Sequence, residues 1–167
     1  MSTDTARLFI ALWPDDEVRA GLRAWRDGWR WPKQATPVRS ERLHMTLHFL
    51  GGVPRDQIDL LADRIALPFE PFTMDFGQPE LWPHGIAVLA PVAVPAPLLR
   101  LQRELGERLQ AAGLTLDARD YRAHVTMARR AAGALMPPDG PPIRWSVASY
   151  ALMESAADGY RVLRTYA

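Results

Sequence analysis

The feature that most constrains the fold of this chain is an internal repeat. The order of residue types in the first half recurs in the second half, eighty residues later. Two His-x-Thr motifs mark the repeat, at His44-Met45-Thr46 and at His124-Val125-Thr126. In a chain with so few histidines, chance would supply only about 0.2 such triplets. A fixed spacing between similar stretches indicates a duplicated unit, so the sequence predicts an internal duplication.

Each motif lies in a short run of apolar and β-branched residues, 43–50 and 123–128, which is typical of a strand. Residues i and i+2 of a strand share one face. Each copy is therefore expected to present an imidazole and a hydroxyl side by side, while the apolar residues between them face a core.

A helix is expected before each motif. Asp15 and Asp16 suit the positive end of a helix that follows Pro14, and Pro95 and Pro97 introduce the second helix. Apolar residues recur at helical spacing in both, at Val18, Leu22, Trp25 and Trp29 and then at Leu98, Leu101, Leu105 and Leu109. Gly113 suits the end of the second helix.

The remaining pattern predicts a third helix, lined by Ile58, Leu61 and Ile65, and further strands at 7–13, 72–76, 86–90, 143–154 and 160–166. No linker long enough to separate two independent domains is visible. We therefore expect an α+β fold that forms one domain over residues 1–167. It should contain two pseudo-symmetric lobes, each a mainly antiparallel sheet with helices on its outer side, and the His-x-Thr strands should face a central cleft.

Composition excludes several classes of protein. The formal net charge of +1 gives no global field to attract nucleic acid, and no apolar run approaches the roughly 20 residues that span a bilayer. Residues 1–5 lack the order of a signal peptide, and the chain has no cysteine. We expect a cytoplasmic protein that does not bind membranes.

Two facing imidazoles suit a displacement at phosphorus, in which one takes a proton from the attacking oxygen and the other gives one to the leaving oxygen. Such attack is roughly in line, so base and acid must lie on opposite sides of the phosphoryl group. The two threonines can donate hydrogen bonds to its non-bridging oxygens. His44 and His124 are therefore the candidate catalytic residues, and Thr46 and Thr126 are candidate phosphate ligands.

With these residues in view, the chain resembles the 2H phosphoesterases, and within them the bacterial RNA 2′,3′-cyclic phosphodiesterases, also called 2′-5′ RNA ligases. The likeness rests on the tandem motif and on four stretches, residues 7–12, 43–51, 121–129 and 154–160. The sequence departs from the family pattern at Ala123, where proline usually precedes the second histidine.

The resemblance implies metal-free and cofactor-free hydrolysis of a terminal 2′,3′-cyclic phosphate to a 2′-phosphate, with a weak reverse reaction that makes 2′-5′ bonds. It implies that His44 donates a proton to the leaving 3′ oxygen and that His124 activates water. It adds Arg129 and Tyr121 as candidate substrate-binding residues. We expect a monomer whose partners are RNA ends or small cyclic phosphate nucleotides.

Several points stay open at this stage. Strict alternation sends Arg130, rather than Arg129, to the side of His124, unless the strand ends near Ala128. His48 shares the predicted face of His44, and Tyr121 can serve either base stacking or the core. Three other readings remain: a metal site using Asp117 or Asp120, a silent RNA-end binding module, and a phosphodiesterase for a small nucleotide such as ADP-ribose cyclic phosphate.

Overall fold

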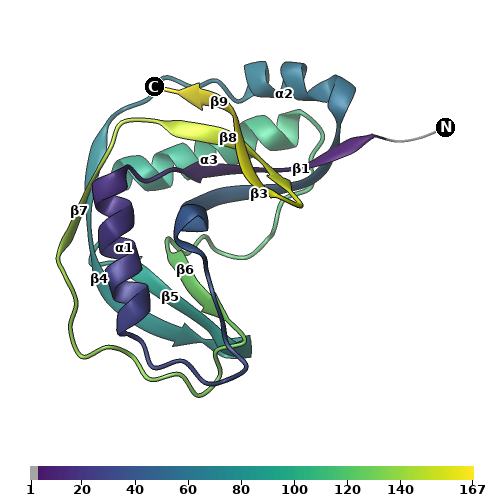
Figure 1. Cartoon of the computed structure of the whole chain (residues 1–167). Coiled ribbons are helices and arrows are strands. Elements are labelled where there is room, and N and C mark those ends of the chain that lie inside the picture. The colour runs from purple at the N-terminus through teal and green to yellow at the C-terminus, as the bar shows by residue number, and fades with distance from the viewer. Residues whose placement is uncertain (1–3) are drawn as a thin grey trace.

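The computed structural model describes residues 4–167 and shows two antiparallel sheets that curl around one open side of the molecule (Figure 1). Residues 1–3 lie outside the described part of the chain, so the predictions for the N-terminal stretch 1–5 and for a domain over 1–167 reach beyond it. No helix in residues 4–167 is long and apolar enough to cross a membrane.

The first sheet has the strand order β3-β1-β8-β9 and the second has the order β2-β6-β5-β4-β7. The strands are β1 (Thr5–Leu12), β2 (Thr36–Pro37), β3 (Met45–Pro54), β4 (Phe72–Trp82), β5 (Ile86–Pro91), β6 (Val125–Arg129), β7 (Ile143–Val147), β8 (Tyr150–Ala156) and β9 (Gly159–Tyr166). The helices are α1 (Asp16–Gly28), α2 (Ile58–Arg64) and α3 (Ala96–Ala111), and short 3₁₀ turns occupy Ser40–Arg42, Arg55–Gln57 and Pro83–Gly85.

The predicted duplication is visible in the element order, because β1-α1-β3 in the first half matches β5-α3-β6 in the second. The helices form where the apolar spacing predicts them. Asp15 caps α1 by accepting a hydrogen bond from the Val18 amide at 2.8 Å. Gly113 follows α3 in the left-handed region, at φ 91°. The α+β class with two antiparallel sheets is thus confirmed.

The prediction of one strand over 143–154 was wrong. β7 ends at Val147 in the second sheet and β8 begins at Tyr150 in the first. The two residues between them carry the chain from one sheet to the other. β7 alternates buried and exposed residues, whereas Tyr150 to Glu154 of β8 are all buried, and the two apolar stretches were read as one strand because only two residues separate them.

Each of the two long helices packs against the sheet of the other half. α1 follows β1 of the first sheet but lies against β7 of the second (Figure 1), where the Trp25 indole donates to the Pro141 carbonyl at 2.7 Å. α3 connects strands of the second sheet but contacts β3 of the first, and His48 Nε2 lies 2.7 Å from the Gln102 carbonyl. One buried apolar cluster runs through both lobes.

Candidate active site

Both histidines are anchored in the same way. Nδ1 of His44 lies 2.7 Å from the Arg42 carbonyl, and Nδ1 of His124 lies 2.6 Å from the Arg122 carbonyl. A carbonyl oxygen can only accept, so Nδ1 carries the hydrogen in each ring. Nε2 of each neutral ring therefore holds a lone pair and can accept a proton. The duplication places these two proton acceptors at equivalent positions of the repeat.

The threonines stand beside the imidazoles, as the strand geometry predicts. Oγ1 of Thr46 lies 2.8 Å from Nε2 of His44. Because this Nε2 has a lone pair, the hydroxyl of Thr46 is the donor. Thr126 has the same offset from His124 and is half-buried, and its hydroxyl makes no hydrogen bond within residues 4–167. It is free to face a ligand.

A β-bulge interrupts each His-x-Thr strand at the same place in the repeat. In β3, Thr46 pairs with Ala11 but His48 pairs with Ile10, so Leu47 is the extra residue. In β6, Thr126 pairs with Val88 but Ala128 pairs with Ala87, so Met127 is the extra residue. Each bulge reverses the alternation of side chains beyond it.

The bulge in β6 resolves the choice between Arg129 and Arg130. Met127 and Ala128 are both buried, and Arg129 is turned to the side of His124 and Thr126. Arg129 lowers the pKa of both histidines by charge repulsion, so it lies near both. It forms no ion pair within the described chain. A free guanidinium here can bind a phosphate.

The bulge in β3 turns His48 away from the side of His44. Its ring faces α3 and bonds the Gln102 carbonyl, and its burial lowers its pKa. Phe49 comes next and corresponds to Arg129 at the shift of eighty residues. Its side chain is 72% exposed and its ring centroid lies 6.5 Å from that of Phe9. His48 is thus a packing residue, and Phe49 lies on the side of Phe9 and His44.

Three aromatic rings enclose His44. The centroids of Phe9, Tyr160 and Trp13 lie 5.0, 5.3 and 5.7 Å from that of its imidazole. Burial is the main cause that lowers the pKa of His44 to about 4, and the charges of Arg19, His124 and Arg129 lower it further. In the ligand-free protein His44 is therefore neutral at pH 7.

His124 has a more open setting. Its ring centroid lies 4.5 Å from that of Trp82, and burial followed by the charges of Arg122 and Arg129 lowers its pKa. The Arg122 guanidinium lies 4.0 Å over the Trp82 ring and 3.3 Å from Glu80. Glu80 also accepts from the Trp82 indole at 2.9 Å. These three side chains form one layer next to His124.

Tyr121 has a fixed place between the lobes. Its hydroxyl donates to the Thr46 carbonyl at 2.9 Å, and burial raises its pKa. The chain segment before His124 is thereby tied to the strand of His44. The sequence predicted a role in substrate binding, and the observed bond is one that positions the two motifs relative to each other.

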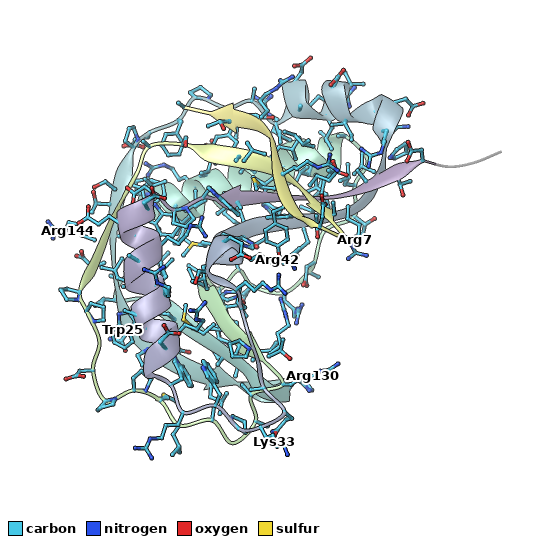
Figure 2. The ribbon with its side chains drawn as sticks, viewed as in Figure 1. Arg7, Trp25, Lys33, Arg42, Arg130 and Arg144 are labelled. Atoms are coloured by element: carbon cyan, nitrogen blue, oxygen red, sulfur yellow. The ribbon has the colours of Figure 1, made fainter. Side chains whose placement is uncertain are left out.

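Arginines on the two sides of the molecule have different partners. Arg42 lies on the side toward which the sheets curl, with its guanidinium 5.4 Å over Tyr160, whereas Arg144 lies on the opposite side and pairs with Asp75 (Figure 2). For the metal alternative, the carboxylate of the predicted ligand Asp117 is bound by Arg119 at 2.6 Å.

Sequence reasoning missed the residues that surround the histidines, namely Trp13, Glu80, Trp82 and Tyr160. They come from three different elements or their ends, namely β1, β4 and β9, and no local pattern links them to the motifs. Only Tyr160 gave a signal, since it lies in the last stretch that carries the resemblance.

Comparison with known proteins identifies the family. Residues 14–159 match the family profile described as the 2′-5′ RNA ligase superfamily. The RNA 2′,3′-cyclic phosphodiesterase of Escherichia coli strain K12 is 31% identical over 151 residues, which cover 87% of this chain and 84% of that protein. That of Thermus thermophilus is 32% identical over 179 residues, which cover 89% of this chain and 81% of that protein.

Solved structures agree with this likeness. The crystal structure of E. coli LigT complexed with 3′-AMP matches with a TM-score of 0.84 and 25% identity, and the match covers 98% of each chain.

Proposed function

The chain belongs to the 2′-5′ RNA ligase superfamily, and from this premise we propose that it hydrolyses RNA 2′,3′-cyclic phosphate ends to 2′-phosphate ends without a metal ion. Relatives from E. coli and Thermus thermophilus are RNA 2′,3′-cyclic phosphodiesterases by name, and E. coli LigT binds 3′-AMP and phosphate in crystals. Ligation to a 2′-5′ bond is part of the proposal: a 5′ hydroxyl replaces water as the attacking group on the cyclic phosphate, the bond from phosphorus to the 3′ oxygen breaks, and the 3′ oxygen takes up a proton.

The observation that carries the proposal is the matched pair of imidazoles. Both Nδ1 atoms bond to the carbonyl two residues earlier, at 2.7 and 2.6 Å, so each ring offers Nε2 for proton transfer. In-line attack at phosphorus needs this kind of pair, with one group on each side.

In the proposed step, Nε2 of His124 takes a proton from water as the water oxygen attacks phosphorus. The bond from phosphorus to the 3′ oxygen breaks, and that oxygen takes the proton from Nε2 of a protonated His44. Thr46, Thr126 and Arg129 hold the non-bridging oxygens, where negative charge grows. A 2′-phosphate and a free 3′ hydroxyl result.

In this scheme Thr46 contacts first the proton donor, His44, and then the phosphate. In the free protein its hydroxyl donates to the lone pair of His44 Nε2, at 2.8 Å. When His44 is protonated, Nε2 becomes a donor and the hydroxyl of Thr46 is released to donate to the phosphate. Binding of the anion and protonation of His44 thus favour each other.

The test is an assay of the purified protein on RNA ends and small nucleotides that carry 2′,3′-cyclic phosphates. Mass spectrometry and nuclease sensitivity would identify the position of the product phosphate. His44→Ala and His124→Ala should each lose ~10²–10⁴-fold in rate, and the double variant should lose less than the product of the two factors. A wild-type rate in either single variant would contradict the paired mechanism.

Metal independence is tested in the same assay. Activity should survive excess EDTA, because the proposed ligands of the phosphate are hydroxyl and guanidinium groups. A loss that Zn²⁺ or Mn²⁺ restores would instead support the metal reading. Binding of RNA ends without turnover would support the silent binding module, and turnover confined to ADP-ribose cyclic phosphate would support a small-nucleotide enzyme.

A further inference from the structure

The short turn that leads to His44 is held by an arginine of α1. The 3₁₀ turn Ser40–Arg42 lies beside α1 and precedes β3 (Figure 1). Nη1 of Arg19 donates to the carbonyls of Ser40 and Leu43, at 2.7 and 2.9 Å. Ser40 is the first residue of the turn, and Leu43 follows its last residue. Arg19 therefore holds the turn at both of its ends.

The same turn supplies the carbonyl that orients the imidazole of His44. Nδ1 of His44 donates to the Arg42 carbonyl at 2.7 Å, and Arg42 lies between the two carbonyls that Arg19 holds. The hydrogen bond made by one ring nitrogen decides which nitrogen carries the hydrogen. A fixed Arg42 carbonyl thus keeps the hydrogen on Nδ1 and the lone pair on Nε2.

Arg19 also reaches His44 through an aromatic ring. Its guanidinium lies 4.8 Å over the ring of Trp13, and Trp13 stacks on the imidazole with ring centroids 5.7 Å apart and planes 23° apart. Nη2 of Arg19 lies 3.5 Å from the carbonyl of Pro14, the residue after Trp13. One half-buried side chain therefore contacts both the turn that orients the imidazole and the ring that stacks on it.

A second arginine of α1 supports the far end of the same segment. Arg26 follows Arg19 by seven residues, so both lie on one face of the helix. The guanidinium of Arg26 donates to the Val38 carbonyl at 2.8 Å and to the Ser40 hydroxyl at 3.0 Å. The Val38 amide donates to the Met127 carbonyl of β6 at 2.8 Å. The segment that leads to the first motif is thus fixed to the strand of the second motif at one end and by Arg19 at the other.

We propose that Arg19 is a positioning residue for His44, which acts through the turn Ser40–Arg42 and through Trp13 to fix the orientation and the tautomer of the imidazole. Arginine suits this task because its planar fork donates in several fixed directions, which the ammonium of a lysine cannot reproduce. The effect on catalysis rests on the proposed function. The effect on the imidazole can be measured without turnover.

The charge of Arg19 acts on His44 separately from its hydrogen bonds. The titratable and charged side chains that act on His44 come from α1, β6 and its N-terminal end, and β9, namely Arg19, His124, Arg129 and Tyr160. Burial is the main cause that lowers the pKa of His44, and the charge of Arg19 lowers it further. Loss of this charge should therefore raise the pKa of His44, whereas loss of the fork alone should leave it in place.

Nuclear magnetic resonance of the histidine nitrogens at pH 7 tests the positioning directly. Arg19→Met removes the fork and the charge, and Arg19→Lys removes the fork alone. Both variants should shift the tautomer of His44 from Nδ1–H toward Nε2–H, and only Arg19→Met should raise the pKa in a titration. His124 is the internal control, because its Nδ1 bonds to the Arg122 carbonyl outside this turn and should keep its tautomer.

Steady-state kinetics test the consequence for catalysis. We expect kcat to fall ~10²-fold in Arg19→Met, the scale for a misplacement of about 1 Å, and ~10-fold in Arg19→Lys. KM should stay within about threefold, because the residues proposed to hold the phosphate are unchanged. The basic limb of the pH profile of kcat/KM should move to higher pH only in Arg19→Met. Arg23→Met, at an exposed position one turn further along α1, is the matched control and should change none of these quantities.

The two measurements separate failure of this inference from failure of the proposed function. Circular dichroism shows which variants fold, and if Arg19→Met does not, Arg19→Lys decides. A folded variant in which His44 keeps the wild-type tautomer overturns the inference, whatever its rate. A shift of His44 and His124 alike would show a general loss of structure and would also overturn it. A shift of His44 alone, in a protein that hydrolyses no cyclic phosphate, keeps the positioning role and overturns the proposed function.

Discussion

At the scale of single residues, the aromatic rings around His44 determine in which direction the pH optimum of the proposed activity is shifted. His44 must be protonated to act as the acid, and in the free protein its pKa is lowered to about 4, from an ordinary 6.5. The protonated fraction therefore falls as the pH rises past 4. The pKa of His124, the proposed base, is also lowered, so its neutral form persists to lower pH.

We predict that the bell-shaped pH profile of kcat/KM, which reports the free enzyme, is centred well below pH 6.5. The profile of kcat should lie at higher pH, because the bound phosphate anion favours protonated His44. Steady-state kinetics from acid to mildly alkaline pH measure both. His44→Ala should remove the basic limb and His124→Ala the acidic limb, although the apparent pKa values belong to the pair. If the profiles of kcat/KM and kcat coincided near neutral pH, the aromatic rings around His44 would not be lowering its pKa in the way proposed.

The two threonines allow a second prediction. Thr46→Val and Thr126→Val keep shape and β-propensity but remove the hydroxyl. Each should cost ~1.5–3 kcal/mol of transition-state stabilisation, or ~10- to 150-fold in kcat/KM. Thr73→Val, on an exposed position of β4, is the control. Wild-type rates in both active-site variants would show that the hydroxyls contribute to the strand structure and not to catalysis.

The candidate catalytic residues could be proposed from sequence because the motif is short, polar and repeated. Their surroundings could not. Trp13, Trp82 and Tyr160 reach the histidines through tertiary packing, and only the folded chain brings them within 4.5 to 5.7 Å of the imidazoles. The lowered pKa values depend on that packing and were beyond sequence reasoning for the same reason.

At the scale of elements, the paired bulges decide which side chains enter the cleft. A bulge is set by the register between neighbouring strands, which hydrophobic alternation within one strand does not reveal. The sequence therefore predicted His48 on the face of His44 and left Arg129 and Arg130 undecided. Both long helices were predictable because their apolar spacing is regular, whereas the strand predicted at 72–76 runs on to Trp82 and the one predicted at 143–154 is two strands.

The bulge at Met127 leads to a prediction for the two neighbouring arginines. Arg129→Ala should lower kcat/KM by ~10- to 150-fold, the scale for loss of a charged hydrogen bond to phosphate. Arg130→Ala removes the same charge from the same strand end and should stay within about twofold. Affinity for inorganic phosphate, measured alongside, should fall only in Arg129→Ala. An equal effect of the two variants would show that net charge, and not the bulge, places the phosphate.

At the scale of the whole molecule, the exchange of helices makes the two lobes one unit. α1 covers the second sheet and α3 contacts the first, and one apolar cluster joins them. The repeat predicted two similar lobes correctly, but a repeat in sequence does not say which copy a helix packs against. Propensity and periodicity describe a helix face, and its partner is chosen by the global topology.

We predict a single cooperative unfolding transition. Leu105→Ala removes a fully buried side chain of α3 and should cost ~2–5 kcal/mol. Tryptophan fluorescence reports mainly on the second sheet and α1, through Trp25, Trp29 and Trp145, yet its transition should shift as far as the far-UV circular dichroism transition. The exposed Leu99→Ala on the same helix is the control. A fluorescence transition that stays in place would mean that the lobes unfold separately.

The strand order of the first sheet has a consequence for how the protein is made. β1 holds the first described residues of any strand, yet one of its two neighbours is β8, which spans Tyr150–Ala156. On the ribosome, β1 emerges long before that partner exists, and the second sheet likewise waits for β7. The second sheet is incomplete until Val147 has been synthesised, and the first until Tyr166 has. The nascent chain must therefore keep its first strands from pairing wrongly for most of translation, which makes this a protein that folds late.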